Sequence, residues 1–295
     1  MTASPAGSPN VMIGIQLPEI DEWSPRVTVA LGMNPGIFTG PGTNTYLVGT
    51  GRRRILLDTG QGVPAYLPVL ERAMERAGCE AIQEIVLTHG HVDHIGGVRA
   101  LRERFGALRV SKLPDPVDTV EELSPLHDGE VVRTEGATLR AAYAPGHARD
   151  HLCFWLEEEH ALFSGDNVLG VGTTVIPTEG GDLQDYLDSL ARLLAGAPGR
   201  IYPAHGPCIA DGVAKLREYI AHRAQREQQI EGALRAIGPA RPADLVAHIY
   251  VDVPVVLHAA AAHSVTAHLL KLEREGRARR ETESAAPLTA RWSLA

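Results

Sequence analysis

The stretch with the clearest potential for chemistry is Thr88–His94, which places three imidazoles and a carboxylate within six residues. The four side chains are His89, His91, Asp93 and His94. Crowded in this way, they compete for protons or repel one another unless a cation joins them. Neutral imidazole nitrogen and carboxylate oxygen are the ligands that zinc prefers. The spacing therefore predicts a metal site, and a polar loop with accidental histidines is the alternative.

Three further potential ligands each follow a predicted strand. They are His147 after Thr138–Tyr143, Asp166 after Ala161–Ser164, and His205 after Arg200–Tyr202. A single His or Asp near a turn usually only caps a loop, so each of them is a weak signal alone. Together with the first cluster they give five histidines and two aspartates. This set is large enough for two zinc ions with one bridging carboxylate and with positions open for water and substrate.

Alternating strands and helices must position these ligands. The apolar run Glu84–Leu87 predicts a buried strand, and Gly96–Gly97 predicts a turn into a helix over Val98–Phe105. Apolar residues at helical spacing predict helices over Pro64–Ala77 and Gly181–Leu194. Other predicted strands are Val27–Leu31, Asn44–Val48, Arg54–Asp58, Leu108–Ser111, Val131–Thr134 and Leu152–Leu156. The pattern indicates an α/β fold with the ligands at one end of a sheet.

Four other residues are candidates for supporting roles. Asp58 ends a strand on the same side as the histidine loop, so we expect it to hold that loop by hydrogen bonds, with a plain turn residue as the alternative. His151 lies four residues beyond His147 and is expected either to support the ligands or to contact substrate. Thr173 and Thr174, in a glycine-flanked loop, are expected to contact substrate oxygens unless they only form a turn.

The chain changes character after residue 210, which predicts a catalytic domain over residues 1–210 and a helical domain over residues 211–295. Asp211 is a good N-cap for a long helix that ends at Gly238. Two more helices and two short strands follow, over Pro242–Ile249, Ser264–Glu275, Arg277–Thr282 and Arg291–Leu294. This order is the outline of a winged-helix unit.

Five cationic residues make this end of the chain locally basic: Lys271, Arg274, Arg277, Arg279 and Arg280. The favoured interpretation is a solvated helix face, because Glu273, Glu275 and Glu281 nearly cancel the charge. A patch that guides RNA phosphates toward the metals is the alternative.

Composition narrows the function classes further. A formal net charge of −8 over 295 residues argues against a broad basic surface for nucleic acid. Cys79, Cys153 and Cys208 imply no disulfide framework. No run of eighteen apolar residues and no secretory signal is evident, so we expect a cytoplasmic protein with no membrane partner. The remaining histidines lack ligand spacing and are expected to be ordinary: His127, His160, His222, His248, His258, His263 and His268.

Four motifs resemble the metal motifs of the metallo-β-lactamase superfamily in order and spacing: His89–His94, Pro145–His147, Ser164–Asp166 and Pro203–Gly206. The resemblance implies a four-layer αββα sandwich with metals at one edge between the sheets. It also implies a ligand set in which His89, His91 and His147 bind one zinc, Asp93, His94 and His205 bind a second, and Asp166 bridges the two. Mn²⁺ or Fe²⁺ are alternatives to Zn²⁺.

A closer resemblance is to the β-lactamase-like protein 2 family, through Gly42–Gly51, Arg54–Gly60, Thr134–Arg140 and Gly172–Val175. Its members include a mitochondrial endoribonuclease for single-stranded RNA and fungal thioesterases that release polyketides from carrier proteins. The resemblance implies a hydrolase that uses a metal-bridging hydroxide, with Asp93 and Asp166 as catalytic residues.

Three functional hypotheses are open at this stage. The chain is expected to be a single-stranded RNA endonuclease, or alternatively a hydrolase of thioesters or lactones, and a non-enzymatic binding module is the third hypothesis. The acidic composition and the lack of an evident transit peptide weaken the ribonuclease hypothesis. Zinc β-lactamases generally lack an aspartate at the place of Asp166, so at most weak β-lactamase activity is expected. The sequence predicts no oligomeric state.

Overall fold

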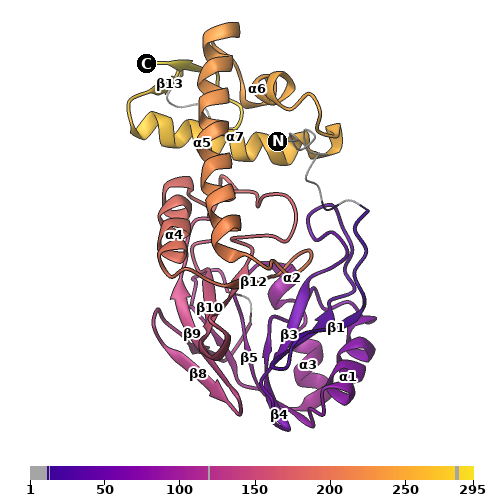
Figure 1. Ribbon diagram of the computed structural model, residues 1–295. Helices are drawn as coiled ribbons and strands as arrows, with labels where there is room; N and C mark the ends of the chain where they lie inside the picture. The colour runs from indigo at the N-terminus through magenta and orange to yellow at the C-terminus, as the bar shows by residue number, and fades with distance from the viewer. Residues whose placement is uncertain (1–11, 13, 119, 283–285) are drawn as a thin grey trace, which may run out of the picture.

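Two β-sheets packed face to face form the body of the molecule, with helices on their outer faces and a smaller helical unit beyond one end (Figure 1). This computed structural model describes residues 12, 14–118, 120–282 and 286–295. The layer order is helix, sheet, sheet, helix. The predicted αββα sandwich with a C-terminal winged-helix unit is therefore confirmed.

The first sheet has seven strands in sequence order. They are β1 (Ile20–Ser24), β2 (Val27–Leu31), β3 (Asn44–Val48), β4 (Arg53–Leu57), β5 (Ala81–Val86), β6 (Val110–Lys112) and β7 (Leu123–Pro125). Pairing is antiparallel from β1 to β4 and parallel from β4 to β7. Parallel strands need crossover connections: α1 (Tyr66–Arg76) lies between β4 and β5, and α3 (Val98–Phe105) lies between β5 and β6. Both helices bury their apolar faces against the outer side of this sheet.

The second sheet has five strands in the order β12-β11-β10-β9-β8. They are β8 (Val131–Thr134), β9 (Ala137–Tyr143), β10 (Leu152–Leu156), β11 (Ala161–Gly165) and β12 (Arg200–Pro203). A 3₁₀ turn, η1 (Glu157–Glu159), closes the hairpin between β10 and β11. The parallel pair β11 and β12 is joined through α4 (Leu183–Ala195), which covers the outer face together with the start of α5 (Gly212–Ile237).

Period-two alternation explains how the strands fill the space between the sheets. Tyr46 and Leu57 point into the core shared with Phe154 and Phe163 of the second sheet. Their neighbour Leu47 points the other way, into the core under α1. The central strands are buried on both faces, which is why their sequences are continuous apolar runs.

The C-terminal unit has its own apolar core. It contains α5, α6 (Pro242–Ile249), η2 (Val255–Leu257), α7 (His258–Arg274) and a two-stranded wing of β13 (Ala278–Arg280) and β14 (Trp292–Leu294). Trp292 and Leu269 lie at its centre and are fully buried. As predicted, Asp211 caps α5 by accepting a hydrogen bond from the Ala214 N–H at 2.9 Å, and Gly238 ends it with a φ of 73°.

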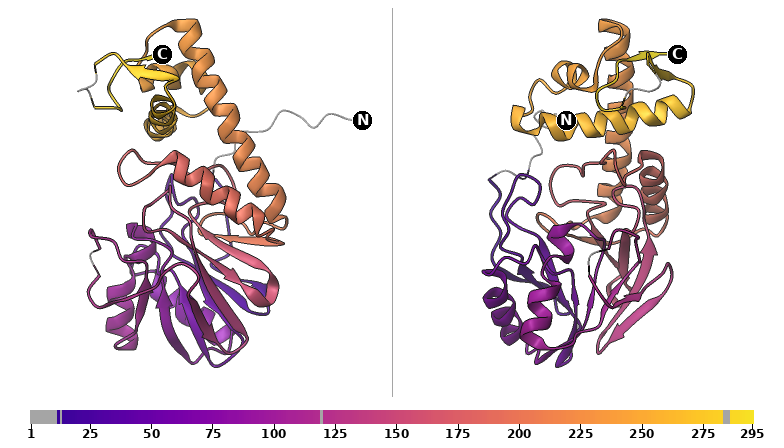
Figure 2. Two further views of the ribbon diagram at one scale, coloured as in Figure 1. Left: turned by 90° about the vertical axis from the view of Figure 1, so that its left-hand side faces the viewer. Right: turned by 180° about the vertical axis from the view of Figure 1, so that it is seen from behind.

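Helix α5 belongs to both parts of the molecule, as the two further views show (Figure 2). Leu216 and Tyr219, in its first half, pack into the core under the second sheet. Ile230 and Leu234, in its second half, pack into the core of the C-terminal unit. The division at residues 210 and 211 stays an interpretation, since one continuous helix serves both cores.

Several elements differ from the sequence expectations. Strands β1 and β7 were not expected, and β7 ends at Pro125, a residue that usually argues against a strand. Helix α7 begins at His258 rather than Ser264. The added turns contain four consecutive alanines, which favour helix strongly but show no apolar periodicity. The expected loop after β5 contains one helical turn, α2 (Val92–Ile95).

One stretch of the described residues, Val255–Arg274, is long and apolar enough to cross a membrane by length and composition alone. About 44% of its most apolar window is buried inside the molecule. Val265, Leu269 and Leu272 from this stretch pack into the core of the C-terminal unit. Its apolar composition is thus accounted for by packing within the fold.

The cationic cluster of the C-terminal unit lies among carboxylates. Lys271 was expected on a solvated helix face, but it is only 8% exposed. Its ammonium pairs with Glu227 at 3.0 Å and with Glu275 at 2.5 Å. Further ion pairs join Arg274 to Asp182 at 2.7 Å, Arg277 to Glu227 at 2.7 Å, and Arg280 to Glu273 at 2.9 Å. Arg279 donates a hydrogen bond to Ser293 Oγ at 3.3 Å.

Candidate metal centre

The predicted ligands from four separate segments meet at one edge of the sandwich. The His89–His94 segment follows β5, His147 follows β9, Asp166 follows β11 and His205 follows β12. The structure brings all seven side chains together in two groups that share Asp166. Within each group the ligand atoms lie within 4.8 Å of one another.

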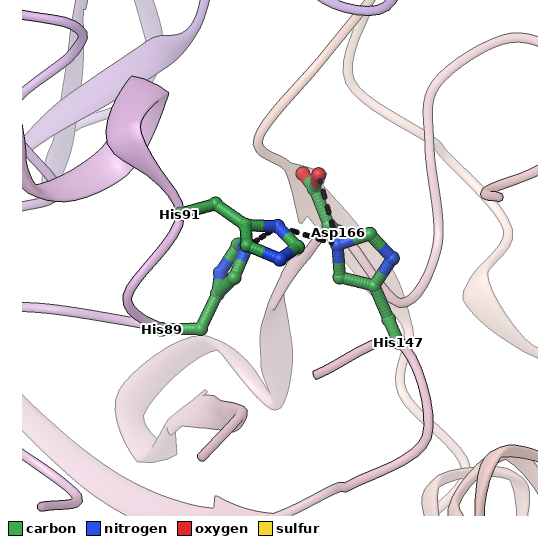
Figure 3. Close-up of side chains that lie close together, drawn as sticks. All are labelled: His89, His91, His147 and Asp166. Carbon is green, nitrogen blue, oxygen red and sulfur yellow. Dashed lines mark hydrogen bonds and ion pairs between the residues drawn. The ribbon is translucent and has the colours of Figure 1, made fainter. Parts of the chain in front are cut away.

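The first group contains three imidazoles and the shared carboxylate, which converge in Figure 3. His91 Nδ1 lies 2.9 Å from His89 Nε2 and 3.0 Å from His147 Nε2. Asp166 Oδ2 lies 3.5 Å from His147 Nε2. Three ring nitrogens and a carboxylate oxygen therefore face a single point, as the ligands of one metal ion would.

The second group is richer in charge. Asp93 Oδ2 lies 3.2 Å from His205 Nε2 and 3.5 Å from His94 Nε2. The other oxygen of the shared carboxylate, Asp166 Oδ1, lies 3.1 Å from His205 Nε2 and 3.4 Å from His94 Nε2. Since Asp166 directs one oxygen at each group, it is placed to bridge two cations.

The electrostatics of the two groups differ. Burial and neighbouring imidazoles hold the pKa of His89 well below its ordinary value, and burial lowers the pKa of His147 to about 4. These rings are neutral and have lone pairs to offer a metal. Burial also opposes a charge on His205, but the carboxylates of Asp166 and Asp93 outweigh it and raise its pKa to about 9. The second group thus attracts positive charge, which a divalent cation supplies.

Unpartnered buried atoms support the same fit. Among the described residues, His94 Nε2 and Asp166 Oδ1 are buried and, despite the short distances given above, neither forms a hydrogen bond with acceptable angles. An unsatisfied buried polar atom is costly, so native proteins rarely leave one without a role. Both atoms face the second group, and a cation held between them would satisfy both. The imidazole and carboxylate donors of the two groups, together with these two unpartnered atoms, fit the ligand requirements of two divalent metal ions.

Asp58 forms hydrogen bonds with the histidine loop, where it was expected to hold that loop. Its carboxylate accepts hydrogen bonds from the Thr88 N–H at 2.8 Å, the Thr88 hydroxyl at 2.9 Å and His94 Nδ1 at 2.8 Å. The last bond fixes the His94 ring with Nε2 directed at the metal position. Asp58 has a φ of 58°, an uncommon conformation that the site stabilises.

We expect Asp58→Asn to lower metal affinity by roughly 10–100-fold, because the amide is a weaker partner for the His94 N–H than the carboxylate. Asparagine tolerates the left-handed backbone, so the fold should persist. Competition with a chromogenic chelator measures the affinity. Asp252→Asn, at an exposed position, is the matched control and should bind metal like the unaltered protein. Equal affinities for the two variants would contradict this role.

The other supporting candidates lie beside the ligands. His151 is fully buried, and its Nε2 accepts a hydrogen bond from the Asp166 N–H at 3.1 Å. It is therefore placed to position Asp166 and is out of reach of substrate. The Thr174 hydroxyl lies 3.1 Å from His147 Nδ1, which also donates to the Val175 carbonyl at 2.8 Å. Thr173 lines the adjoining pocket.

A buried ion cluster under the first group was not expected. Lys112 is fully buried, and its ammonium lies 2.7 Å from Asp118 Oδ1 and 2.5 Å from Asp150 Oδ2. A Cβ added at Gly90 would lie 3.1 Å from Asp150 Oδ2, so the cluster sits directly beneath the loop that carries His89 and His91. No local sequence signal marks the burial of Lys112, which directly follows the predicted strand Leu108–Ser111.

A pocket of about 900 Å³ opens onto the metal centre. His91, Asp93, His147, Asp166 and His205 contribute to its floor. Its walls come from both parts of the molecule and are mainly apolar, with Ile37, Phe38, Leu169, Val171, Val253 and Leu257 among the lining residues. His222 also lines it, although it was expected to be an ordinary histidine.

Cys208 is not part of either ligand group, and its Sγ donates to the Ile201 carbonyl at 3.6 Å.

Two family models match the chain. Residues 38–205 match the metallo-beta-lactamase superfamily, and residues 242–292 match the beta-lactamase associated winged helix domain. Two solved structures share the whole arrangement. A metallo-beta-lactamase family protein from Thermus thermophilus has a TM-score of 0.76 and 25% identity, with 93% of this chain and 100% of that chain covered. A beta-lactamase domain protein from Burkholderia ambifaria has a TM-score of 0.79 and 21% identity, with 96% of each chain covered, which shows the fold alone.

Curated relatives extend the match over nearly the full length. A beta-lactamase-like protein 2 homolog of Caenorhabditis elegans is 41% identical over 87% of this chain and 87% of its own. An atrochrysone carboxyl ACP thioesterase of Aspergillus novofumigatus is 41% identical over 74% of this chain and 66% of its own. Since the first family model spans more than half of the chain and relatives align at this level, the chain belongs to the metallo-β-lactamase superfamily of hydrolases, among the β-lactamase-like protein 2 homologues.

Proposed function

We propose that the chain is a dinuclear zinc-dependent hydrolase that cleaves the thioester bond of an acyl substrate. The observation that carries this proposal is the pocket, which joins a seven-ligand centre to mainly apolar walls. Apolar walls with a few convergent polar groups are typical of sites for small organic substrates. An acyl chain would lie against these walls with its carbonyl carbon at the metal centre.

The relatives support the same substrate class. Proteins 41% and 43% identical to this chain are named atrochrysone carboxyl ACP thioesterases. Single-stranded RNA is bound along cationic grooves with aromatic platforms for the bases. Most cations of the C-terminal unit instead lie in ion pairs with carboxylates. The endonuclease activity stays a prediction, and the thioester is the better supported substrate.

In this proposal His89, His91 and His147 would hold one zinc, Asp93, His94 and His205 the other, and Asp166 would contact both. Bound zinc lowers the pKa of water to about 7 and polarises a carbonyl oxygen. Burial raises the pKa of the Asp93 carboxyl, but His94 and His205 outweigh it and hold that pKa well below its ordinary value, so the oxygens stay unprotonated. Asp93 and Asp166 can therefore accept hydrogen bonds from the attacking water and orient it toward the thioester carbon.

A turnover panel tests the proposal. Zinc-loaded protein is offered an acyl thioester, a lactone, single-stranded RNA and a chromogenic β-lactam, with Asp166→Ala as the blank for every substrate. We expect Asp166-dependent turnover of the thioester, with the β-lactam cleaved weakly at most. Asp166-dependent cleavage of RNA without thioester turnover would replace this proposal by the endonuclease. No Asp166-dependent turnover of any substrate would reject the hydrolase mechanism.

A further inference from the structure

One wall of the otherwise mainly apolar pocket carries two arginines. Helix α5 contributes His222, Arg223, Gln225 and Arg226 to the lining, and Tyr250 faces them from the loop after α6. The metal ligands contribute to the same pocket. A substrate that reaches the metals can therefore touch these side chains at the same time.

Arg223 is a buried guanidinium with unused capacity for hydrogen bonds. Its side chain is 3% exposed, one N–H donates to the Thr174 carbonyl at 2.6 Å, and the guanidinium lies over the Tyr186 ring at 5.2 Å. Its Nε is buried without a hydrogen-bond partner among the described residues. A buried charge is stable only when it is paired, so this arrangement favours an anion beside it.

Arg226, about one helical turn further along, is partly buried and has similar unused capacity for hydrogen bonds. Its guanidinium lies 3.8 Å from the centre of the Tyr250 ring, and its Nε is also buried without a partner among the described residues. Tyr250 therefore orients the planar group. In the described part of the chain, no carboxylate forms an ion pair with Arg223 or Arg226, whereas Arg277 and Lys271 of the same unit are each paired with Glu227.

The neighbouring groups respond to this concentration of positive charge. Burial, then Arg223 and Arg226, lower the pKa of His222 to about 4, so this ring is neutral. Two carboxylates, Glu179 and Glu218, also line the pocket. Glu218 forms its ion pair with Lys215, at 2.8 Å. The α5 wall thus keeps two cations that carboxylates of the described chain do not neutralise.

We propose that Arg223 and Arg226 form a subsite for an anionic oxygen group, a phosphate or a carboxylate, on the substrate whose acyl carbon reaches the metal centre. The planar guanidinium binds such groups with two parallel hydrogen bonds. This inference rests on the proposed thioester hydrolysis for the identity of the reacting bond. Two sources supply the anion: the phosphate of a phosphopantetheine arm that carries the acyl group, or a carboxylate on the acyl chain itself.

Three acyl thioesters distinguish these sources: a neutral acyl pantetheine, the same acyl group on 4′-phosphopantetheine, and a pantetheine thioester whose acyl chain ends in a carboxylate. We expect the zinc-loaded protein to prefer one of the two anionic substrates in kcat/KM by roughly tenfold or more, the effect of one charge-assisted hydrogen bond. Arg226→Met should abolish most of that preference, and Arg226→Lys, which keeps the charge without the planar fork, should retain part of it.

Arg217→Met is the matched control, because Arg217 is an exposed arginine on the same helix outside the pocket. It should keep the full preference. A preference that is absent in the unaltered protein, or that survives Arg226→Met unchanged, would overturn the subsite. Thermal melting of each variant shows whether it is folded.

A binding measurement separates this inference from the proposed function. Calorimetric titration of the zinc-loaded protein with pantetheine, phosphopantetheine and a free dicarboxylate needs no turnover. We expect Arg226→Met to weaken binding of one anionic probe by about tenfold. Arg217→Met should bind all three probes like the unaltered protein. Arg226-dependent binding without thioester hydrolysis would contradict the proposed function but support the anion subsite. Anion binding that ignores Arg226, such as binding at the metals alone, would overturn the subsite.

Discussion

Replacing Asp166 by alanine is expected to lower thioester turnover by roughly a thousandfold or more, the upper range for loss of one group that stabilises the transition state. The side chain is the only one shared by both ligand groups of the described chain, with Oδ2 near His147 and Oδ1 near His205. Its loss removes a ligand from both groups at once. We therefore expect the variant to hold less than one metal ion per chain after dialysis. Mass spectrometry measures the metal content, and initial rates measure thioester turnover.

Asp188→Ala is the matched control for this change. Asp188 is an exposed aspartate on α4, outside both ligand groups. It should leave rate and metal content as in the unaltered protein. Full turnover and full metal content in Asp166→Ala would contradict a bridging role for the carboxylate.

The second large effect is expected for Gly146→Ala, which should reduce the free energy of unfolding by about 3 kcal/mol or more. A Cβ at this position would lie 2.3 Å from both the backbone nitrogen and the Cα of Tyr186, and the backbone has a φ of 124°. Neither atom can move without displacing α4. Urea denaturation measures the loss, and turnover should fall as well because His147 follows directly in the chain.

Gly78→Ala separates the steric clash from the backbone conformation. Gly78 has a φ of 63°, but a Cβ there would meet nothing within 4 Å. Only the left-handed conformation is penalised, so the expected loss is about 1 kcal/mol with unchanged turnover. If both variants lost the same free energy of unfolding, Gly146 would not be needed for the close packing of α4 against the His147 loop.

The candidate ligands could be picked out from the sequence because each one is marked by a local pattern. His89–His94 form a dense cluster, and His147, Asp166 and His205 each follow a strand whose apolar pattern is plain. Strands that end on the same side of a sandwich must bring such residues near one another. Asp58 was predictable for the same reason, since its strand β4 pairs with β5, which precedes the histidine loop.

The features that sequence reasoning missed depend on contacts between distant segments. Lys112 is typical of a surface residue until β6 places it between Asp118 and Asp150. The role of Arg223 depends on the loop at Thr174, forty-nine positions away. The pocket itself lies between the sandwich and the C-terminal unit, and its shape follows from how α5 joins them. No pattern within one segment encodes these distances.

The most direct test of the two-metal centre is a zinc titration of metal-free protein during acyl thioester hydrolysis. The two ligand groups that share Asp166 predict that activity rises until two equivalents of zinc per chain are bound and then stays constant. Calorimetry on the same samples should count two sites in the unaltered protein. Full activity at one equivalent, or activity that does not depend on zinc, would contradict the dinuclear centre.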